Sequence, residues 1–177
     1  MLFRSESAVT TPARRVAALI ATSAWIGLIV QFHASIAILG SVLPTLTSLI
    51  WYFTILTNLL VAIVFTGIAL GRASFSAPPL VASTTLYILL VGIIYGLLLH
   101  GLPELSGHSN IANMLLHMVT PAAVPLFWLL FTPKGHLQAR HLLFWAIYPL
   151  GYLFYVIIRG EFTGRYRSEE RRVGKEC

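Results

Sequence analysis

The residues that could do chemistry in this sequence are polar side chains set inside long apolar stretches. The first group is Thr54, Thr57 and Asn58, which interrupt an apolar run that begins at Trp51. On a helix that turns 100° per residue, Thr47, Thr54 and Asn58 fall within about 40° of one another, whereas Thr57 lies about 60° or more to the side. Thr54 and Asn58 are therefore expected to share one face of a helix.

The second group is Asn113, His117 and Thr120, which recur at the i, i+4 and i+7 spacing of a single helix face. An imidazole titrates near neutral pH, so His117 can act as a general base. Pro121 cannot donate the backbone hydrogen bond that the carbonyl of His117 would accept, and Pro125 repeats this effect one turn later. We predict an opened helix backbone next to the histidine.

The composition of the chain places both groups in a membrane. Of 177 residues, 57% are hydrophobic and 10% are charged, whereas soluble domains are about one quarter charged. Apolar stretches near the ~20 residues that cross a bilayer core alternate with short loops, so neighbouring spans are antiparallel. We predict an all-α membrane protein, an antiparallel bundle of five transmembrane helices with spans at about residues 16–40, 46–70, 80–99, 111–131 and 142–158.

Polar groups on three of these spans fall at a common depth. If the second span begins near residue 46 and rises 1.5 Å per residue, Thr54 lies roughly 12 Å below the outer boundary. His117 on the fourth span and His33 near the end of the first span both come to roughly 10 Å. Polar groups are costly in lipid, so this convergence predicts a buried functional site.

Structural interpretations compete with the functional one. A threonine in a membrane helix usually bonds to a carbonyl of its own helix or packs against another helix. His33 either supports the site or is an interfacial residue. Tyr152, Tyr155 and Arg159 form a helical stripe on the last span, which either lines a cleft for a carboxylate or is an aromatic belt with a snorkelling arginine. The belt is the favoured interpretation of that stripe.

The distribution of basic residues predicts the orientation in the membrane. In the five-span arrangement, one side holds Arg4, Arg14, Arg15, Arg72, Lys134 and Arg140. The other side holds only Arg159 and Arg165 before the tail. The N-terminal segment, residues 1–15, is therefore expected to be cytoplasmic. The formal charge of +6 is accounted for by this topology, so a nucleic acid partner is not expected.

Residues 16–166 form the predicted transmembrane domain, and residues 167–177 differ from it abruptly in charge. This tail matches what a common sequencing-library adapter gives when translated, so we expect an assembly artefact and a truncated chain.

The sequence has no phosphate-binding glycine loop, no metal-ligand spacing of Cys and His, and no nucleophile elbow. Neither a metal nor a cofactor is expected, and nothing indicates a protein partner.

Short motifs along almost the whole chain to Tyr166 suggest a family. They are Trp51-Tyr-Phe-Thr-Ile-Leu-Thr-Asn58, Asn113-Met-Leu-Leu-His117 followed by Pro121, Pro133-Lys-Gly135, Trp145-Ala-Ile-Tyr-Pro149, and Tyr155 to Gly160. Together they resemble the androgen-induced membrane hydrolase family in its bacterial branch. Animal members are multi-span proteins that hydrolyse fatty acid esters of hydroxy fatty acids. The resemblance implies a bacterial cytoplasmic membrane protein whose relatives have a further, sixth span.

The resemblance also implies residue roles. His117 matches the family's histidine, because the Asn-x-x-x-His spacing and the following proline agree. Thr54 matches the nucleophilic threonine, with Thr57 as the alternative because the gap to the polar residue is one longer here. His117 would accept the Thr54 proton, and the alkoxide would attack a lipid ester to give an acyl-threonine. Asn58, Asn113 or opened backbone groups would orient the histidine or stabilise the oxyanion.

A function from another class uses the same residues. In a lipid-binding, sensory or small-solute-handling protein, these groups would form a polar intramembrane pocket with no reaction. Membrane lipids or fatty acid esters are the expected partners of the hydrolase.

Overall fold

A computed structural model of the chain describes residues 9–99, 108–135 and 137–163. These residues are helical apart from short connections, and no strand occurs among them. Four helices are long and apolar enough to cross a membrane, and a bent pair of helices raises the number to five. The predicted all-α class is confirmed, and the predicted number of five spans corresponds to counting the bent pair as one span. Residues 1–8 and 167–177, including the predicted artefact, lie outside the described residues.

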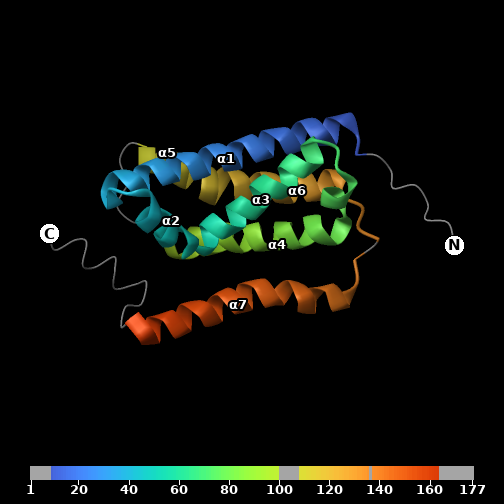
Figure 1. Cartoon of the computed structure of the whole chain (residues 1–177). Coiled ribbons are helices and arrows are strands. Elements are labelled where there is room, and N and C mark those ends of the chain that lie inside the picture. Colours follow the sequence, from blue (N-terminus) through green and yellow to red (C-terminus); the bar gives the residue numbers. More distant parts are fainter. Residues whose placement is uncertain (1–8, 100–107, 136, 164–177) are drawn as a thin grey trace. The chain divides into compact units, whose positions relative to one another are not determined.

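The chain divides into two compact units at residue 137, and each is described by itself. The described part of the second unit contains one helix, α7 (Ala139–Thr163). The elements of the first unit are shown in Figure 1: α1 (Thr11–Leu39), α2 (Val42–Ile50), α3 (Phe53–Ala69), the 3-10 turn η1 (Ala73–Ser76), α4 (Pro78–Ile94), the π segment η2 (Tyr95–Leu99), α5 (His108–Met114), the π segment η3 (Leu115–Val119) and α6 (Thr120–Phe131).

Local sequence signals set the ends of α1. The Oγ1 of Thr10 accepts a hydrogen bond from the backbone N–H of Ala13, as an N-cap does, and Pro12 lies in the first turn. Gly40 ends the helix with φ 75°, a left-handed conformation that favours glycine, and its N–H bonds to the carbonyl of Ile36. The helix covers the span predicted at residues 16–40 to within one residue at its end and extends five residues before it.

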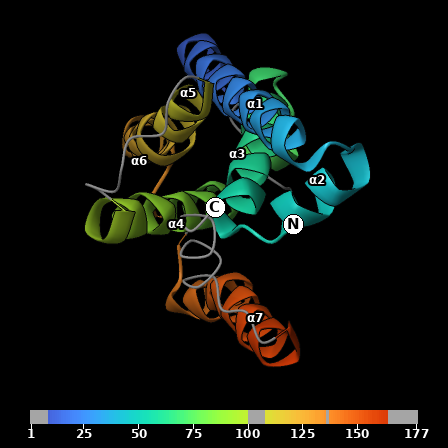
Figure 2. The ribbon, with the colours of Figure 1, turned by 90° about the vertical axis from the view of Figure 1, so that its left-hand side faces the viewer.

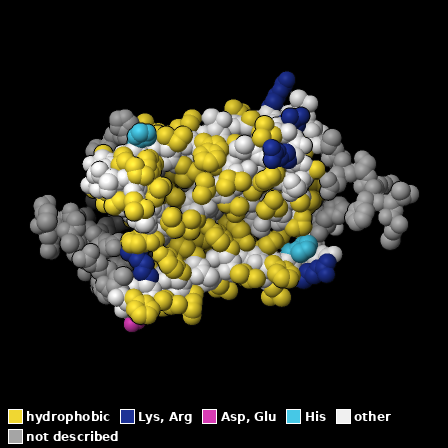
Figure 3. All heavy atoms as spheres, viewed as in Figure 1, with side chains coloured by type: hydrophobic (Ala, Val, Ile, Leu, Met, Phe, Trp, Pro, Cys, Tyr) yellow, Lys and Arg dark blue, Asp and Glu magenta, His cyan; other side chains and the backbone are white. Residues whose placement is uncertain are grey.

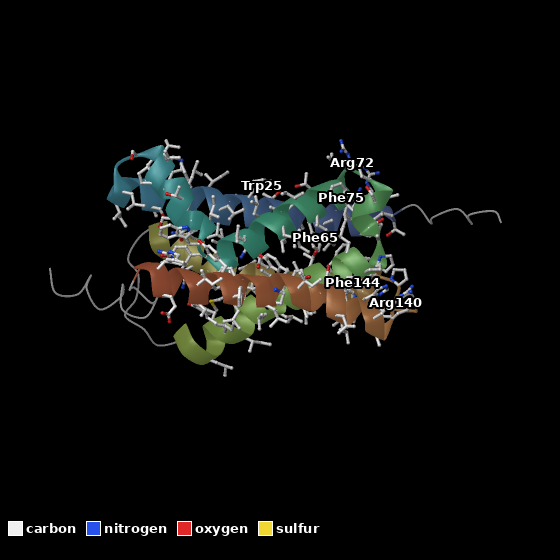
Figure 4. The ribbon with its side chains drawn as sticks, turned by 60° about the horizontal axis from the view of Figure 1, so that its bottom comes forward. Trp25, Phe65, Arg72, Phe75, Arg140 and Phe144 are labelled. Carbon is white, nitrogen blue, oxygen red and sulfur yellow. The ribbon has the colours of Figure 1, made fainter. Side chains whose placement is uncertain are left out.

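The helices of the first unit pack as an antiparallel bundle. Helix α1 lies along α3 and also contacts α5, η3 and α6, while α4 packs on α3 and α6. Figure 2 views the bundle from its end and shows α1, α3, α4 and the α5–α6 helix around a common centre. Trp25 on α1 donates its indole N–H to the Thr66 hydroxyl on α3 at 3.1 Å, and Phe65 packs edge-on against Phe127. Trp25 and Phe65 are labelled in Figure 4.

The predicted second span is not one continuous helix. Helices α2 and α3 meet at Trp51 and Tyr52 and are bent by 93°. Tyr52 is extended, with φ −101° and ψ 119°, so the helical hydrogen-bond series stops and restarts there. The expectation of a helix over residues 46–70 was wrong at its beginning, because Leu46 and Thr47 belong to the separate helix α2. Thr47 therefore does not share a face of α3 with Thr54 and Asn58.

One end of the bundle carries basic side chains. Arg14 at the start of α1 donates from Nε to the carbonyl of Ala69 at the end of α3, at 3.0 Å. Arg72 lies just before η1. The ring of Phe75 in η1 packs over Gly67 of α3, and a Cβ on that glycine would lie 2.2 Å from the ring. On the first unit in Figure 3, basic side chains gather at one end and hydrophobic ones cover the face beyond it. This arrangement is consistent with the predicted grouping of Arg14 and Arg72 on one side of the membrane.

Large apolar side chains cover the outside of the helices. Leu19, Leu97 and Leu130 are each more than 70% exposed, and none of the apolar window of α7 is buried. Soluble monomers seldom expose contiguous apolar surface of this extent. Several exposed apolar helices of spanning length indicate that the protein is embedded in a membrane.

Candidate functional site

The candidate site lies around η3, where the fourth span changes from α-helix to π-helix. Pro121 has no N–H for the carbonyl one turn earlier, so the regular hydrogen-bond series cannot pass it. The hydroxyl of Thr120, which is fully buried, donates to the carbonyl of Leu115 at 2.8 Å, five residues back. The opened backbone predicted next to His117 is confirmed as the π segment Leu115–Val119. Such segments are rare, and many occur at functional sites.

Asn58 joins α3 to this opened backbone. Its Nδ2 donates both to the carbonyl of Thr54 in its own helix, at 2.9 Å, and to the carbonyl of Leu116, at 3.1 Å. The side chain is fully buried, and among the described residues its Oδ1 has no hydrogen-bond partner. A buried acceptor without a partner costs about 1–3 kcal/mol, so it indicates a place where a water or a ligand donor can bind.

His117 sits within η3 in a small polar cluster. Its Nδ1 is 3.2 Å from the carbonyl of Asn113, and its ring stacks on that of Tyr95 with centroids 4.7 Å apart. Asn113 donates from Nδ2 to the Tyr95 hydroxyl at 2.6 Å. Since a carbonyl can only accept, Nδ1 carries the proton in this contact, and Nε2 is then the basic nitrogen. The cluster thus orients the imidazole through two different neighbours.

Glycines on two other helices allow this close packing. A Cβ on Gly27 of α1 would lie 2.7 Å from Leu116 Cδ2 and 3.2 Å from Leu115 Cβ. A Cβ on Gly92 of α4 would lie 2.8 Å from Pro121 Cβ. All three distances are shorter than van der Waals contact, so a Cβ at Gly27 would press on side chains of η3 and one at Gly92 on Pro121 in the first turn of α6. Helices α1, α3 and α4 thus all pack against the segment that carries His117.

Thr54 and Thr57 differ in accessibility. Thr54 is half-buried in the first turn of α3, whereas Thr57 is fully buried. No hydrogen bond between the Thr54 hydroxyl and His117 is present in the described part of the chain, and the link between them runs through Asn58 to the adjacent Leu116. The pairing of Thr54 with His117 stays a prediction.

The break before α3 changes the depth argument. Because α3 begins at Phe53, Thr54 is one residue, about 1.5 Å, along that helix and not ~12 Å. Asn58 lies about 7.5 Å along it, and Leu116 lies about 9 Å from Asn110, where the fourth span begins. The groups that share a depth are thus Asn58 and η3, which are also the groups in contact.

Of the remaining predicted residues, one lies on α1 of the first unit and three lie in the second unit. His33 is exposed on α1, and its ring contacts the neighbouring Phe32 edge-on, with centroids 6.2 Å apart. Tyr152, Tyr155 and Arg159 lie on α7, in the second unit, and the two tyrosine rings contact each other at 6.3 Å. The roles expected for these four residues stay predictions. Among the described residues, no group of three His, Cys, Asp or Glu that could hold a metal ion is found.

Tyr95 is the site residue that sequence reasoning missed. It stands at the start of the π segment η2, one residue after α4 ends. The available signal was its place in an apolar span three residues after Gly92, with its hydroxyl in need of a polar partner. Sequence spacing cannot reveal that this partner is Asn113, which lies on a different span.

The chain was also compared with known proteins. No protein-family model, no curated protein and no solved structure matches it. The family expected from the short motifs is therefore neither supported nor excluded, and the function has to be argued from the site itself.

Proposed function

We propose that this protein is an integral membrane hydrolase that cleaves lipid esters, with Thr54 as nucleophile and His117 as general base. The observation that carries the proposal is the side-chain amide of Asn58. Its Nδ2 donates both to the carbonyl of Thr54 and to the carbonyl of Leu116, the residue before His117. This link sets a hydroxyl and a basic imidazole at the same end of the bundle. No metal or cofactor is required for this chemistry.

The reaction has two halves. In the first, Nε2 of His117 accepts the Thr54 proton as Oγ1 attacks the ester carbonyl, and the imidazolium then gives that proton to the departing alkoxide, which leaves as an alcohol. In the second, His117 removes a proton from water, which attacks the acyl-threonine; the fatty acid is released and the imidazolium returns the proton to Thr54 Oγ1. Nucleophile and base must come within about 2.6–3.2 Å, and such contacts often tighten only when substrate binds.

Tyr95 supplies a donor for the developing oxyanion. Because its oxygen accepts a hydrogen bond from Asn113, its own hydroxyl proton is left to be donated elsewhere. A donor aimed at the negative charge of the transition state contributes a factor of about 10²–10³ in rate. Substituting Tyr95→Phe keeps the ring that stacks on His117 and removes only this proton. We expect a lower kcat for ester hydrolysis with little change in KM.

Thr54 is preferred to Thr57 because a nucleophile must meet its substrate. Thr57 is fully buried, whereas Thr54 is half-buried at the end of α3. A long-chain ester reaching the site from the bilayer would encounter Thr54 first. If Thr57 were the nucleophile, the helices would have to separate for acylation.

The test is hydrolysis of fluorogenic lipid esters by the full chain in proteoliposomes. Thr54→Ala and His117→Ala should each lower kcat by at least about 10³-fold, and Thr54→Ser should retain part of the activity. Thr47→Ala is the matched control, since this threonine is exposed and bonds only within α2. Full activity of both the Thr54 and the His117 variants would end the proposal.

A non-enzymatic polar pocket is the second candidate. It is favoured by the contacts of His117 with Tyr95 and Asn113, which hold the imidazole among polar groups. A fluorophosphonate probe separates the two functions. Labelling that is lost in Thr54→Ala supports the hydrolase, whereas lipid binding without labelling of the wild-type chain supports the pocket.

A further inference from the structure

We propose that α2 lies in the plane of the membrane, with its outer apolar face in contact with the lipid acyl chains at one bilayer interface. The inference concerns α2 alone and does not depend on the proposed hydrolase. The first observation is the angle between α2 and α3, which is 93°. Helix α3 has 17 residues and a length of about 26 Å, close to the ~30 Å of a hydrocarbon core. Since α3 nearly crosses the bilayer, α2 is left to run along its surface.

The second observation is the distribution of side chains around α2. Four large apolar side chains, Val42, Leu43, Leu46 and Ile50, are 45–71% exposed and fall within an arc of about 100°. Thr45 and Leu49, on the neighbouring arc, are buried in the protein. This division into a buried face and an exposed apolar face suits a helix at the boundary of lipid and water.

The polar side of α2 indicates which partner the helix fits. Thr47 and Ser48 lie away from the centre of the apolar arc, and the Thr47 hydroxyl bonds to the carbonyls of Leu43 and Pro44. The helix has no charged residue. Its attraction to the membrane is therefore apolar, and anionic headgroups are not needed. Trp51 and Tyr52, at the junction with α3, are the residue types that gather at the level of the headgroups.

Continuity with the lipid-facing surface completes the argument. Leu59 and Ile63 on α3 are 37% and 45% exposed, so the apolar surface of the spans continues from α3 toward α2. Leu46 and Ile50 on α2 are likewise exposed, at 45% and 55%. The occupant of the outer face of α2 is thus the same lipid that surrounds the spans.

Depth measurements along α2 test the proposal. Leu43→Cys, Leu46→Cys and Ile50→Cys are made singly in a Cys177→Ser chain, labelled with a nitroxide and reconstituted in phosphatidylcholine vesicles. Collision rates with oxygen and with a water-soluble nickel complex give the depth of each label. For an in-plane helix, the three depths should agree within about 3 Å, the rise of two residues. Adding phosphatidylglycerol should leave them unchanged.

Two results would overturn the proposal. One is a depth that changes steadily by about 10 Å from residue 43 to residue 50, as in a helix that crosses the membrane. The other is shielding of all three labels from both reagents, which would show that protein, such as a second copy of the chain, covers the face. Leu59→Cys and Ile63→Cys are the controls, and their depths should differ by up to about 6 Å because α3 crosses the bilayer.

Discussion

Two helices of the first unit are interrupted, and the two interruptions have opposite effects on the direction of the chain. In the fourth span, α5, η3 and α6 continue as one membrane-spanning helix although Pro121 removes a backbone donor. Between α2 and α3 no proline is present at the break, yet the helix axis turns by 93°. Loss of a donor is therefore neither sufficient nor necessary for a sharp bend.

The surroundings of each interruption explain the difference. The carbonyls of Leu115 and Leu116 in the fourth span accept hydrogen bonds from Thr120 and Asn58, and neighbouring helices pack tightly against them at Gly27. At the α2–α3 junction, Ile50 and Trp51 are exposed, and the backbone closes on itself through short local bonds. An interruption that is enclosed by its neighbours stays straight enough to span, whereas one at the end of the bundle can turn.

The largest change in unfolding free energy should come from a lysine on α3, compared with a lysine on α2, on the other side of the break. Ile63→Lys puts an ammonium group near the middle of α3, where it should cost about 2.5–3.5 kcal/mol of stability in a bilayer. Leu46→Lys on α2 should cost less than about 1 kcal/mol, because a lysine at the interface reaches water. Unfolding free energies in bicelles measure both. Equal losses would mean that α2 also lies within the hydrocarbon core.

Next in size is a matched pair of glycines beside the fourth-span interruption. Gly92→Ala should destabilise the protein by about 1–2 kcal/mol, because the new Cβ would lie 2.8 Å from the rigid ring of Pro121. Gly96→Ala, one turn along the same chain segment, meets no atom within 4 Å and should be neutral or slightly stabilising. Thermal unfolding distinguishes the two, and similar midpoints would show that η3 is not tightly enclosed.

Removal of the Asn58 side-chain donor should have a smaller effect. Asn58→Leu leaves the carbonyl of Leu116 without its partner, which should cost about 1 kcal/mol, near the average for hydrogen bonds between membrane helices. Asn110→Leu is the control, since Asn110 is exposed at the start of the fourth span. Chemical unfolding in detergent measures the difference. An Asn58 variant as stable as the Asn110 variant would remove the proposed coupling of α3 to η3.

The smallest effect is expected for single hydroxyl groups. Thr120→Val deletes the bond to the carbonyl of Leu115 with little change of shape, and should cost about 0.5–1 kcal/mol. The equivalent change Thr47→Val, on exposed α2, should have almost no effect on stability. Isotope-edited infrared spectroscopy should also show a shifted carbonyl band for Leu115 in the first variant. An unshifted band would mean that the hydroxyl does not support the π segment.

The fold class and most span positions could be predicted from the sequence because membrane insertion depends on composition and length. The opened backbone beside His117 was equally predictable, since proline removes a specific donor. The bend before α3 was not, because residues 46–70 are apolar on both sides of Trp51 and no proline or glycine marks the break. Counting depth from residue 46 then placed Thr54 too far along its helix.

The partners within the site were predictable only in part. The polar character of Asn58 and Asn113 was evident, and both are found in hydrogen bonds around η3. Their partners, the carbonyl of Leu116 and the hydroxyl of Tyr95, lie on other spans, so no spacing within one helix reveals them. The contact of Tyr95 with His117 depends on how two spans rotate against each other, which sequence periodicity does not determine.

The π segment η3 also determines which insertions and deletions the fourth span can accept. A π turn holds about one residue more than an α turn, so η3 is equivalent to a single-codon insertion in an α-helix. Deleting one residue there, for example Met118, would restore a regular helix and rotate everything after it by about 100°. Val124 and Phe127, now buried in α6, would turn toward lipid. Changes of chain length within this span should therefore be tolerated far less than amino-acid substitutions on its outer face.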